Sequence, residues 1–313
     1  MHDSVREAFL PFNEPMEGRV RFMYLDVKRL VSTGVGNLLD ADDPGDFGSN
    51  PQPLPDIFTL GWFDKTTTAA ADSAEIGAEY QHVKFSGTAS KPLLPDKEAI
   101  TRLRITDEAI NDLVSHKLDS FEDSLRQRAA FADLDQWPAD GQLGLFSMAW
   151  AMGPFFKFPK FQAAAQQQDW LTMALECKMT EAGNPGVIPR NVRNGLLFTL
   201  AGWMAAPPPG DFTQLFFDPA QKLDALMRSG AFPLPMNLVI GLQAALETLG
   251  FDPHGLDGVL GKNTRTALNA FQAAHGLPPT SSVTSIDDVP RQTRDVLLAQ
   301  LDDKGAAHFG DPV

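Results

Sequence analysis

The stretch LQAALETLGFDPHGLDGVLGKNTRTALNAFQAAHGL, residues 242–277, decides the fold of the C-terminal part of the chain. Its first half continues an apolar helix face that recurs at helical spacing in Val239, Leu242, Leu246 and Leu249. Gly250 is placed to end this helix, and Leu268 with Phe271 begins the stripe of a second one. The sequence therefore predicts at least two packed helices here.

A tight loop is expected between these helices. Asp257, Gly258 and Gly261 are turn residues, because aspartate bonds nearby backbone amides and glycine reaches positive φ. Thr264 can cap the second helix with its hydroxyl group. Folding alone explains each of these residues as well as ligand binding does.

Taken together, residues 242–277 resemble the three-helix peptidoglycan-binding module that stands beside many cell-wall hydrolases. The resemblance implies that sugar or stem-peptide binding belongs to residues 236–305. The chain departs from the family in one place. The family usually repeats an Asp-Gly turn before its last helix, whereas residues 278–290 form a longer stretch rich in Ser, Thr and Asp.

A second motif lies near the N-terminus and consists of Glu17, Asp26, Ser32, Gly34 and Gly36. It resembles the active-site segment of the tailed-phage lysozymes. The resemblance implies that Glu17 protonates the leaving glycosidic oxygen, while Asp26 and Ser32 hold the attacking water. The family usually has threonine where Ser32 stands, and serine keeps the hydroxyl group.

Hydrolysis by two carboxyl groups requires one to be protonated and the other ionised, so their environments must differ. Glu17 ends a helical segment, and Asp26 lies in a polar hairpin predicted between Met23 and Val35. The lysozyme resemblance further implies that Gly36 and Leu38 line the sugar groove.

The same resemblance covers most of residues 4–203, for which we expect helices over 106–125, 141–152, 161–181 and 190–203. Thr106 can cap the first of them. Arg190 matches a family arginine that closes over the catalytic glutamate, although it also suits a surface position at a helix start. Trp150 falls at an aromatic cleft position, although a tryptophan in an apolar helix is more often part of a core.

The predicted fold is α+β and mostly helical: a lysozyme-like domain with a small antiparallel hairpin over 1–205, a Pro-rich linker over 206–235, and the three-helix domain over 236–305. An N-terminal helix should end or bend at Pro11. An insertion over about 40–95 contains Ile76, Tyr80 and Val83 at helical spacing. Trp62 and Phe63 in it suit packing better than sugar stacking.

The 313 residues carry a formal charge of −14, which disfavours nucleic acid as a partner and leaves wall binding to local contacts. No apolar run is long enough to cross a membrane, and the first residues lack the pattern of an export signal. The single cysteine, Cys177, is expected to be a buried, inert thiol. We expect no cofactor or metal, since no metal-binding histidine motif occurs.

The sequence points to an N-acetylmuramidase that acts on peptidoglycan glycan strands. The absence of a G-x-S-x-G motif argues against a serine hydrolase. A lytic transglycosylase would use one glutamate, and a wall-binding protein on a lysozyme scaffold would use neither carboxylate. We expect synthesis in the cytoplasm and action in the periplasm or cell wall, as a phage endolysin or as a delivered antibacterial effector with an immunity or delivery protein as partner.

Overall fold

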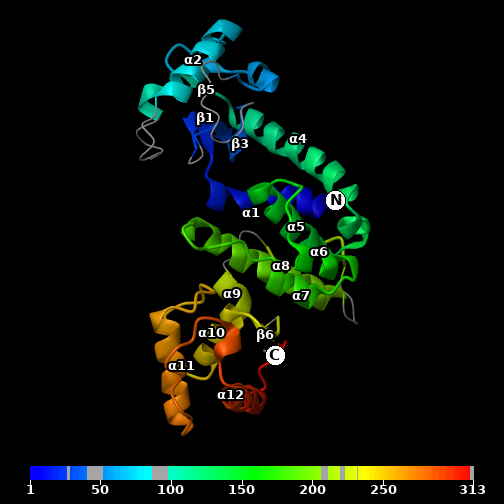
Figure 1. Cartoon of the computed structure of the whole chain (residues 1–313), viewed down its shortest axis with the longest axis vertical. Helices are drawn as coiled ribbons and strands as arrows, with labels where there is room; N and C mark the ends of the chain where they lie inside the picture. The colour runs from blue at the N-terminus through cyan, green and yellow to red at the C-terminus, as the bar shows by residue number, and fades with distance from the viewer. Residues whose placement is uncertain are drawn as a thin grey trace. The chain divides into compact units, whose positions relative to one another are not determined.

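The computed structural model describes residues 1–26, 29–40, 52–86, 98–205, 211–218, 223–230 and 232–310 (Figure 1). The chain divides into two compact units. One comprises Leu10–Ser120, and the other comprises Met1–Phe9 together with Phe121–Val313. The described part is mostly helical and has a small antiparallel sheet, which confirms the predicted α+β class. None of its helices combines the length and the apolar character that crossing a membrane requires.

The first helix, α1 (Asp3–Glu17), runs past both Pro11 and Pro15. Of the two outcomes expected at Pro11, an end or a bend, the end was wrong. A proline inside a helix costs about 3 kcal/mol, and fully burying a phenylalanine side chain contributes roughly 1.5–3 kcal/mol. Val5, Phe9 and Phe12 are all buried on this helix, so packing offsets the loss.

A three-stranded antiparallel sheet follows α1 in the unit Leu10–Ser120. It consists of β1 (Val20–Leu25), β2 (Val31–Gly34) and β3 (Asn37–Leu38), with β2 in the centre. The predicted hairpin is confirmed, and β3 is an additional strand. A second antiparallel pair joins β4 (Phe63–Asp64) to β5 (Leu103–Arg104).

The described part of the predicted insertion packs on this sheet. It contains η1 (Pro55–Thr59) and α2 (Ser73–Phe85), and α2 contacts β1 and β2 (Figure 1). The expected helical face is confirmed, because Ile76, Tyr80 and Val83 are buried. Trp62 is also buried and donates its Nε1–H to the Ile57 carbonyl oxygen at 2.8 Å, so it packs in the core. Residues 41–51 and 87–97 of the insertion lie outside the described residues.

A buried ion pair anchors α2 to the end of β3. Lys84 Nζ lies 2.5 Å from Asp40 Oδ2, and Tyr80 Oη donates to Asp40 Oδ1 at 2.8 Å. Asp40 Oδ2 also accepts from the backbone N–H of Val31 at 3.0 Å. Burial acts to raise the pKa of Asp40, but the hydrogen bonds from Lys84, Val31 and Tyr80 outweigh it and lower that pKa.

The long helix α4 (Asp107–Arg126) begins where the sequence predicts. Thr106 Oγ1 accepts a hydrogen bond from the Ala109 N–H at 3.1 Å, which confirms the cap. Two short 3-10 helices, η2 (Ala129–Phe131) and η3 (Leu134–Gln136), follow α4.

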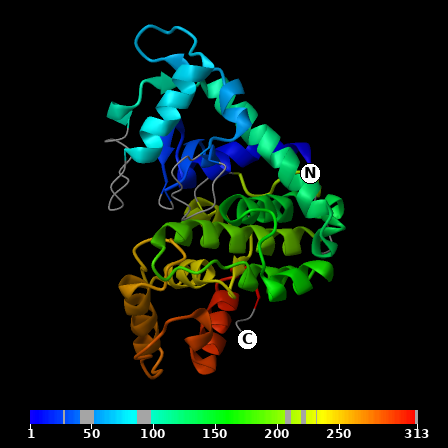
Figure 2. The same cartoon turned by 45° about the horizontal axis from the view of Figure 1, so that its top comes forward.

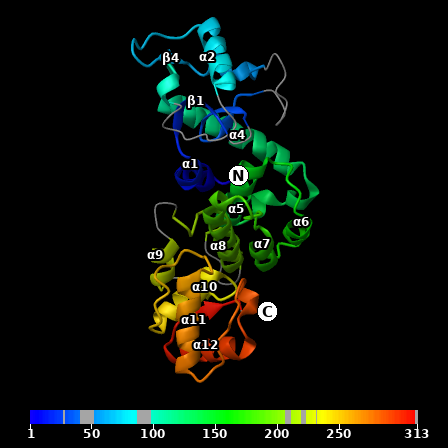
Figure 3. The ribbon, with the colours of Figure 1, turned by 60° about the vertical axis from the view of Figure 1, so that its left-hand side comes forward.

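Four helices form the centre of the other unit: α5 (Ala139–Met152), α6 (Pro159–Gln166), α7 (Trp170–Glu176) and α8 (Ile188–Ala205) (Figure 3). The short η4 (Pro185–Val187) leads into α8. The single helix predicted over 161–181 was wrong, because the chain breaks between α6 and α7. Gln168 adopts a positive φ of 51°, and Asp169 restarts the helix by accepting from the Thr172 N–H at 3.1 Å.

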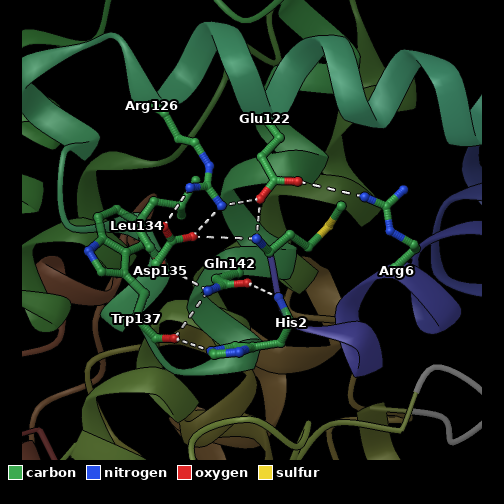
Figure 4. Close-up of polar contacts among 9 residues, drawn as sticks. His2, Arg6, Glu122, Arg126, Leu134, Asp135, Trp137 and Gln142 are labelled. Atoms are coloured by element: carbon green, nitrogen blue, oxygen red, sulfur yellow. Dashed lines mark hydrogen bonds and ion pairs between the residues drawn. The ribbon is translucent and has the colours of Figure 1, made fainter.

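Polar contacts join the start of α1 to the end of α4 and to η3 (Figure 4). Glu122 contacts the amino group of Met1 and lies 2.6 Å from Arg126 Nη2 and 3.6 Å from Arg6 Nη2. Gln142 of α5 accepts from the His2 N–H at 2.8 Å. These contacts fix the first turn of α1 within its unit.

The C-terminal helices are α10 (Val239–Thr248), α11 (Lys262–Ala274) and α12 (Arg291–Asp303), which gather together in Figures 2 and 3. The 3-10 helix η5 (Ile286–Asp288) precedes α12. Gly250 follows α10 with a φ of 91°, which confirms that it ends this helix. The expectation that Thr264 caps α11 was wrong, because α11 begins at Lys262 and Thr264 lies inside its first turn.

The predicted linker is partly packed. Ahead of α9 (Leu223–Arg228), the backbone N–H groups of Phe216 and Phe217 donate to the buried Asp140 carboxylate of α5, each at 2.9 Å. Beyond α9, Phe232 packs against Trp203 of α8 with ring centroids 5.3 Å apart. The strands β6 (Leu234–Pro235) and β7 (His308–Phe309) then pair in parallel. Residues 206–210, 219–222 and 231 lie outside the described residues.

Candidate functional site

The antiparallel register brings three side chains to one face of the small sheet. Tyr24 of β1 lies opposite Ser32 of β2, and Ser32 lies opposite Leu38 of β3. Residues directly opposite each other in an antiparallel ladder project to the same face. Ser32 is only 4% exposed, whereas Leu38 is 44% exposed, so this face runs from a buried hydroxyl group to an accessible apolar side chain.

The electrostatics of Tyr24 connect this face to both predicted carboxylates. Burial, together with the negative charges of Glu17 and Asp26, raises the pKa of Tyr24 to about 12. Glu17 is the last residue of α1, and Gly18 turns the chain toward β1 with a φ of 78°. Both carboxylates therefore act electrostatically on one phenol group.

Asp26 has a second role in the turn between β1 and β2. Its backbone N–H donates to the Leu30 carbonyl oxygen at 2.8 Å, and its Oδ1 accepts from the Leu30 N–H at 2.8 Å. Arg29 in the same turn has a φ of 64°. The turn thus fixes the orientation of the Asp26 carboxylate, which is a requirement for positioning a water molecule and also a sufficient reason for an aspartate here.

The two glycines of the motif shape the turn between β2 and β3. Gly34 and Gly36 have φ angles of 64° and 71°. A Cβ atom at Gly34 would lie 2.8 Å from Asn37 Oδ1, which accepts from the Val35 N–H at 3.1 Å. Gly36 uses its carbonyl oxygen to accept from Lys117 Nζ at 3.3 Å. Glycine is therefore required by the backbone at Gly34, whether or not a sugar is bound.

The remaining predicted site residues, Trp150 and Arg190, belong to the other unit. Trp150 is 6% exposed, with its ring centroid 5.0 Å from that of Phe9 and 6.0 Å from that of Phe121. Arg190 is buried, and its Nη1 donates to the carbonyl oxygen and the hydroxyl group of Ser147 at 3.2 and 3.0 Å. The environment of Trp150 is that of a packing residue, whereas Arg190 is held rigidly by α5.

Two chemically relevant features escaped the sequence interpretation. Tyr24 lies within the segment of the N-terminal motif, but its pairing with Ser32 becomes visible only in the strand register. The signal in the sequence is the two-residue spacing of Tyr24 and Asp26, which is the spacing of side chains on one face of a strand. The Asp40–Lys84 pair had no local signal, because its partners are distant in sequence. Among the described residues, no group of three or more histidine, cysteine, aspartate or glutamate side chains is placed to hold a metal ion.

Cys177 behaves as a packing residue. It is 1% exposed, its Sγ donates to the Ala174 carbonyl oxygen at 3.2 Å, and burial raises the pKa of its thiol to about 12. A thiol with this pKa is neutral at physiological pH. The expectation of an inert thiol is confirmed.

The motif residues of the C-terminal domain brace its loops. Gln243 Nε2 donates to Asp257 Oδ1 at 2.7 Å and to Thr264 Oγ1 at 3.0 Å, while its Oε1 accepts from the Gly258 N–H at 2.8 Å. Gln272 does the same one helix later, donating to Thr293 Oγ1 at 3.0 Å. The side-chain amides of Gln243 and Gln272 form their hydrogen bonds within the domain, so contacts to a ligand must come from other residues.

One of two comparisons with known proteins identifies a domain in the C-terminal part of the chain. A search of curated proteins finds no match to the chain. Residues 236–285 match the family model of the peptidoglycan binding domain. The C-terminal part of the chain is therefore similar to peptidoglycan-binding domains. This similarity indicates interaction with the bacterial cell wall.

Proposed function

We propose that the chain is an N-acetylmuramidase that cleaves the β-1,4 bond between MurNAc and GlcNAc in peptidoglycan. The observation that carries the proposal is the action of the Glu17 and Asp26 charges on one phenol group, Tyr24, which shares a sheet face with Ser32. The peptidoglycan-binding domain supplies the substrate class. Two carboxylates beside one sheet face are the groups that glycoside hydrolysis requires.

In this proposal, Glu17 is the general acid. Its place at the end of α1, next to the turn at Gly18, lets it reach a glycosidic oxygen from the edge of the sheet. Asp26 is the general base, since the Leu30 N–H fixes its orientation. Ser32 assists by binding the attacking water through its hydroxyl group. Leu38 and Gly36 are proposed to border the sugar groove.

A second candidate is a wall-binding protein that lacks catalysis. One observation favours it: Asp26 Oδ1 bonds the Leu30 N–H, so the carboxylate has a structural reason to be present. A lytic transglycosylase is the third candidate, because it would use Glu17 and would leave Asp26 with this structural role alone. These three functions give different products, and product analysis therefore separates them.

The test is mass spectrometry of fragments released from purified sacculi. Wild type is expected to release muropeptides with reducing MurNAc ends, and Glu17→Gln should reduce the rate by about 10²–10⁴-fold because the general acid is lost. Anhydro-MurNAc ends would show a transglycosylase instead. No released product, together with binding to sacculi, would show a wall-binding protein.

A matched control is available on the same helix. Glu14 of α1 pairs with Arg19 Nε at 3.1 Å and is 36% exposed, so Glu14→Gln removes a carboxylate that has a surface role. We expect Glu14→Gln to retain full activity.

We further propose that the protein acts in the periplasm or cell wall, as an endolysin or as a delivered effector with an immunity partner. The lysis of cells that produce it with and without export would distinguish these routes.

A further inference from the structure

A pocket of about 410 Å³ lies within the unit that contains the C-terminal domain. Leu175, Lys178 and Glu181 form one side, at the end of α7 and just beyond it. Val259 and Asp287 form the facing side, from the loop after α10 and from η5. The volume falls within the roughly 300–1,000 Å³ typical of ligand pockets. The peptidoglycan-binding domain supplies only one side of it.

Contacts between the two sides give this pocket a defined shape. Gly258 of the Asp-Gly turn packs on α8 so closely that a Cβ atom there would lie 2.7 Å from both methyl carbons of Val192. Gly195 of α8 similarly faces Leu238, at the start of α10. The C-terminal domain is therefore seated on α8 beside the pocket. A ligand would meet a preformed site rather than a gap between loosely tethered parts.

The rim of the pocket carries charges of both signs and exposed apolar side chains. Lys178 Nζ lies 3.3 Å from Glu181 Oε2, and these side chains are 62% and 30% exposed. Asp287 adds a second negative charge. Leu175 and Val259 are 45% and 37% exposed, so both side chains can contact a ligand. This combination suits a ligand that bears a carboxylate, an ammonium group and aliphatic surface.

One buried amide borders the pocket. Asn237 is 4% exposed, and neither its Nδ2 nor its Oδ1 atom has a hydrogen-bond partner among the described residues. Its Oδ1 atom lies against Gly310, where a Cβ atom would be only 2.6 Å away, and both polar atoms are closed off from the pocket. The Asn237 amide therefore packs behind the lining and offers no contact to a ligand.

The chemistry of the lining separates a peptide from a sugar. None of the described residues that line the pocket is aromatic. Sugar rings are bound by stacking on aromatic faces, and the pocket offers no such face. The charged groups of a peptide, in contrast, match Lys178 and Asp287.

We propose that this pocket binds a short peptide carrying both a carboxylate and an ammonium group, the chemistry of a peptidoglycan stem peptide. The choice of stem peptide rests on the proposed cell-wall function. Lys178 binds the carboxylate, Glu181 and Asp287 bind the ammonium group, and Leu175 with Val259 covers the aliphatic part. The chain would then contact the glycan at the sheet face near Glu17 and the peptide at this separate pocket.

The test is isothermal titration calorimetry on the full chain with the synthetic stem tripeptide of alanine, γ-linked glutamate and diaminopimelate. Leu175→Trp fills the pocket and Lys178→Glu reverses its positive charge, and each is expected to weaken binding by about tenfold or more. Leu171→Trp is the control for the first, because Leu171 is also exposed on α7 but does not line the pocket. Lys160→Glu is the control for the second, since Lys160 pairs with Glu176 at 3.2 Å outside the pocket.

Both controls should bind within about twofold of wild type. The proposal is overturned if wild type shows no saturable binding up to about 1 mM tripeptide, or if both pocket variants bind it like wild type. It is also overturned if the pocket variants lose binding of chitotriose and keep binding of the tripeptide. Glu17→Gln should bind the tripeptide like wild type. A wild-type protein that releases no reducing ends from sacculi but binds the tripeptide would reject the proposed hydrolysis and leave this pocket standing.

Discussion

Tyr24 of β1 lies directly opposite Ser32 of β2 in the antiparallel ladder. Burial, the charge of Glu17 and the charge of Asp26 all raise the pKa of the Tyr24 phenol. Tyr24 is therefore a reporter of the proposed site that does not depend on catalysis. The chain contains two tyrosines, so each can be followed separately.

We expect the Tyr24 phenol to titrate near pH 12, as its raised pKa of about 12 requires. In Glu17→Gln/Asp26→Asn its pKa should fall toward the ordinary value and stay above it, because burial is the largest cause of the shift. NMR of ¹³Cζ-labelled tyrosine measures this, with Tyr24→Phe to assign the signal. An unchanged pKa of Tyr24 in the double variant would show that the charges of Glu17 and Asp26 do not act on the phenol group.

Ser32 should be required for its hydroxyl group. Ser32→Ala is expected to slow release of reducing ends by about 10–100-fold, since a misplaced water loses its alignment. Ser32→Thr restores the hydroxyl group, suits a strand, and should retain most of the activity. The rates on purified sacculi test both variants. Equal activity of Ser32→Ala and wild type would remove Ser32 from the proposed mechanism.

Asp140 should make stability depend on pH. Burial raises its pKa from 3.8 to about 6, while the N–H groups of Phe216 and Phe217 act to lower it. Between about pH 4 and 6 the folded state therefore binds more protons than the unfolded state, so the contribution of Asp140 to the free energy of unfolding falls as pH rises, by roughly 3 kcal/mol. Urea denaturation of wild type and Asp140→Asn at both ends of this window measures the difference. Parallel pH profiles would contradict the raised pKa.

Phe232 should hold the C-terminal segment to α8. Its buried ring lies 5.3 Å from Trp203 and 5.4 Å from Phe309, measured between ring centroids. Phe232→Ala should lower the free energy of unfolding by about 3–5 kcal/mol. Phe155→Ala is the control, because Phe155 is 69% exposed and should change stability by less than about 0.5 kcal/mol. Similar losses from both variants would show that the aromatic cluster does not anchor this segment.

The buried Asp40–Lys84 pair should be sensitive to the loss of one partner. Lys84→Met leaves a buried negative charge and is expected to cost about 3–5 kcal/mol. Asp40→Asn/Lys84→Met removes both charges and should recover part of this loss. Thermal and urea denaturation measure both. A double variant less stable than Lys84→Met would contradict the ion-pair explanation.

Sequence periodicity predicted the local elements well where apolar spacing and caps agree. The Thr106 cap and the stripe from Ile110 to Leu125 placed α4 correctly. The same reasoning joined α6 and α7, because the apolar pattern continues through the break that Gln168 and Asp169 impose. It also offered Pro11 as an end of α1, besides a bend, since the local cost of proline was visible and the packing that offsets it was not.

By itself, the sequence determined the helical class, the hairpin with Asp26 in its turn, and the peptidoglycan-binding domain, because turn residues and apolar spacing act over a few neighbouring positions. The tertiary structure decided which distant groups meet: Tyr24 with Ser32, the Asp140 carboxylate with Phe217, and the two sides of the pocket near Lys178. Such contacts depend on strand register and on the removal of polar groups from water. Neither quantity is fixed by local sequence, because both are set by segments that approach one another only in the folded chain.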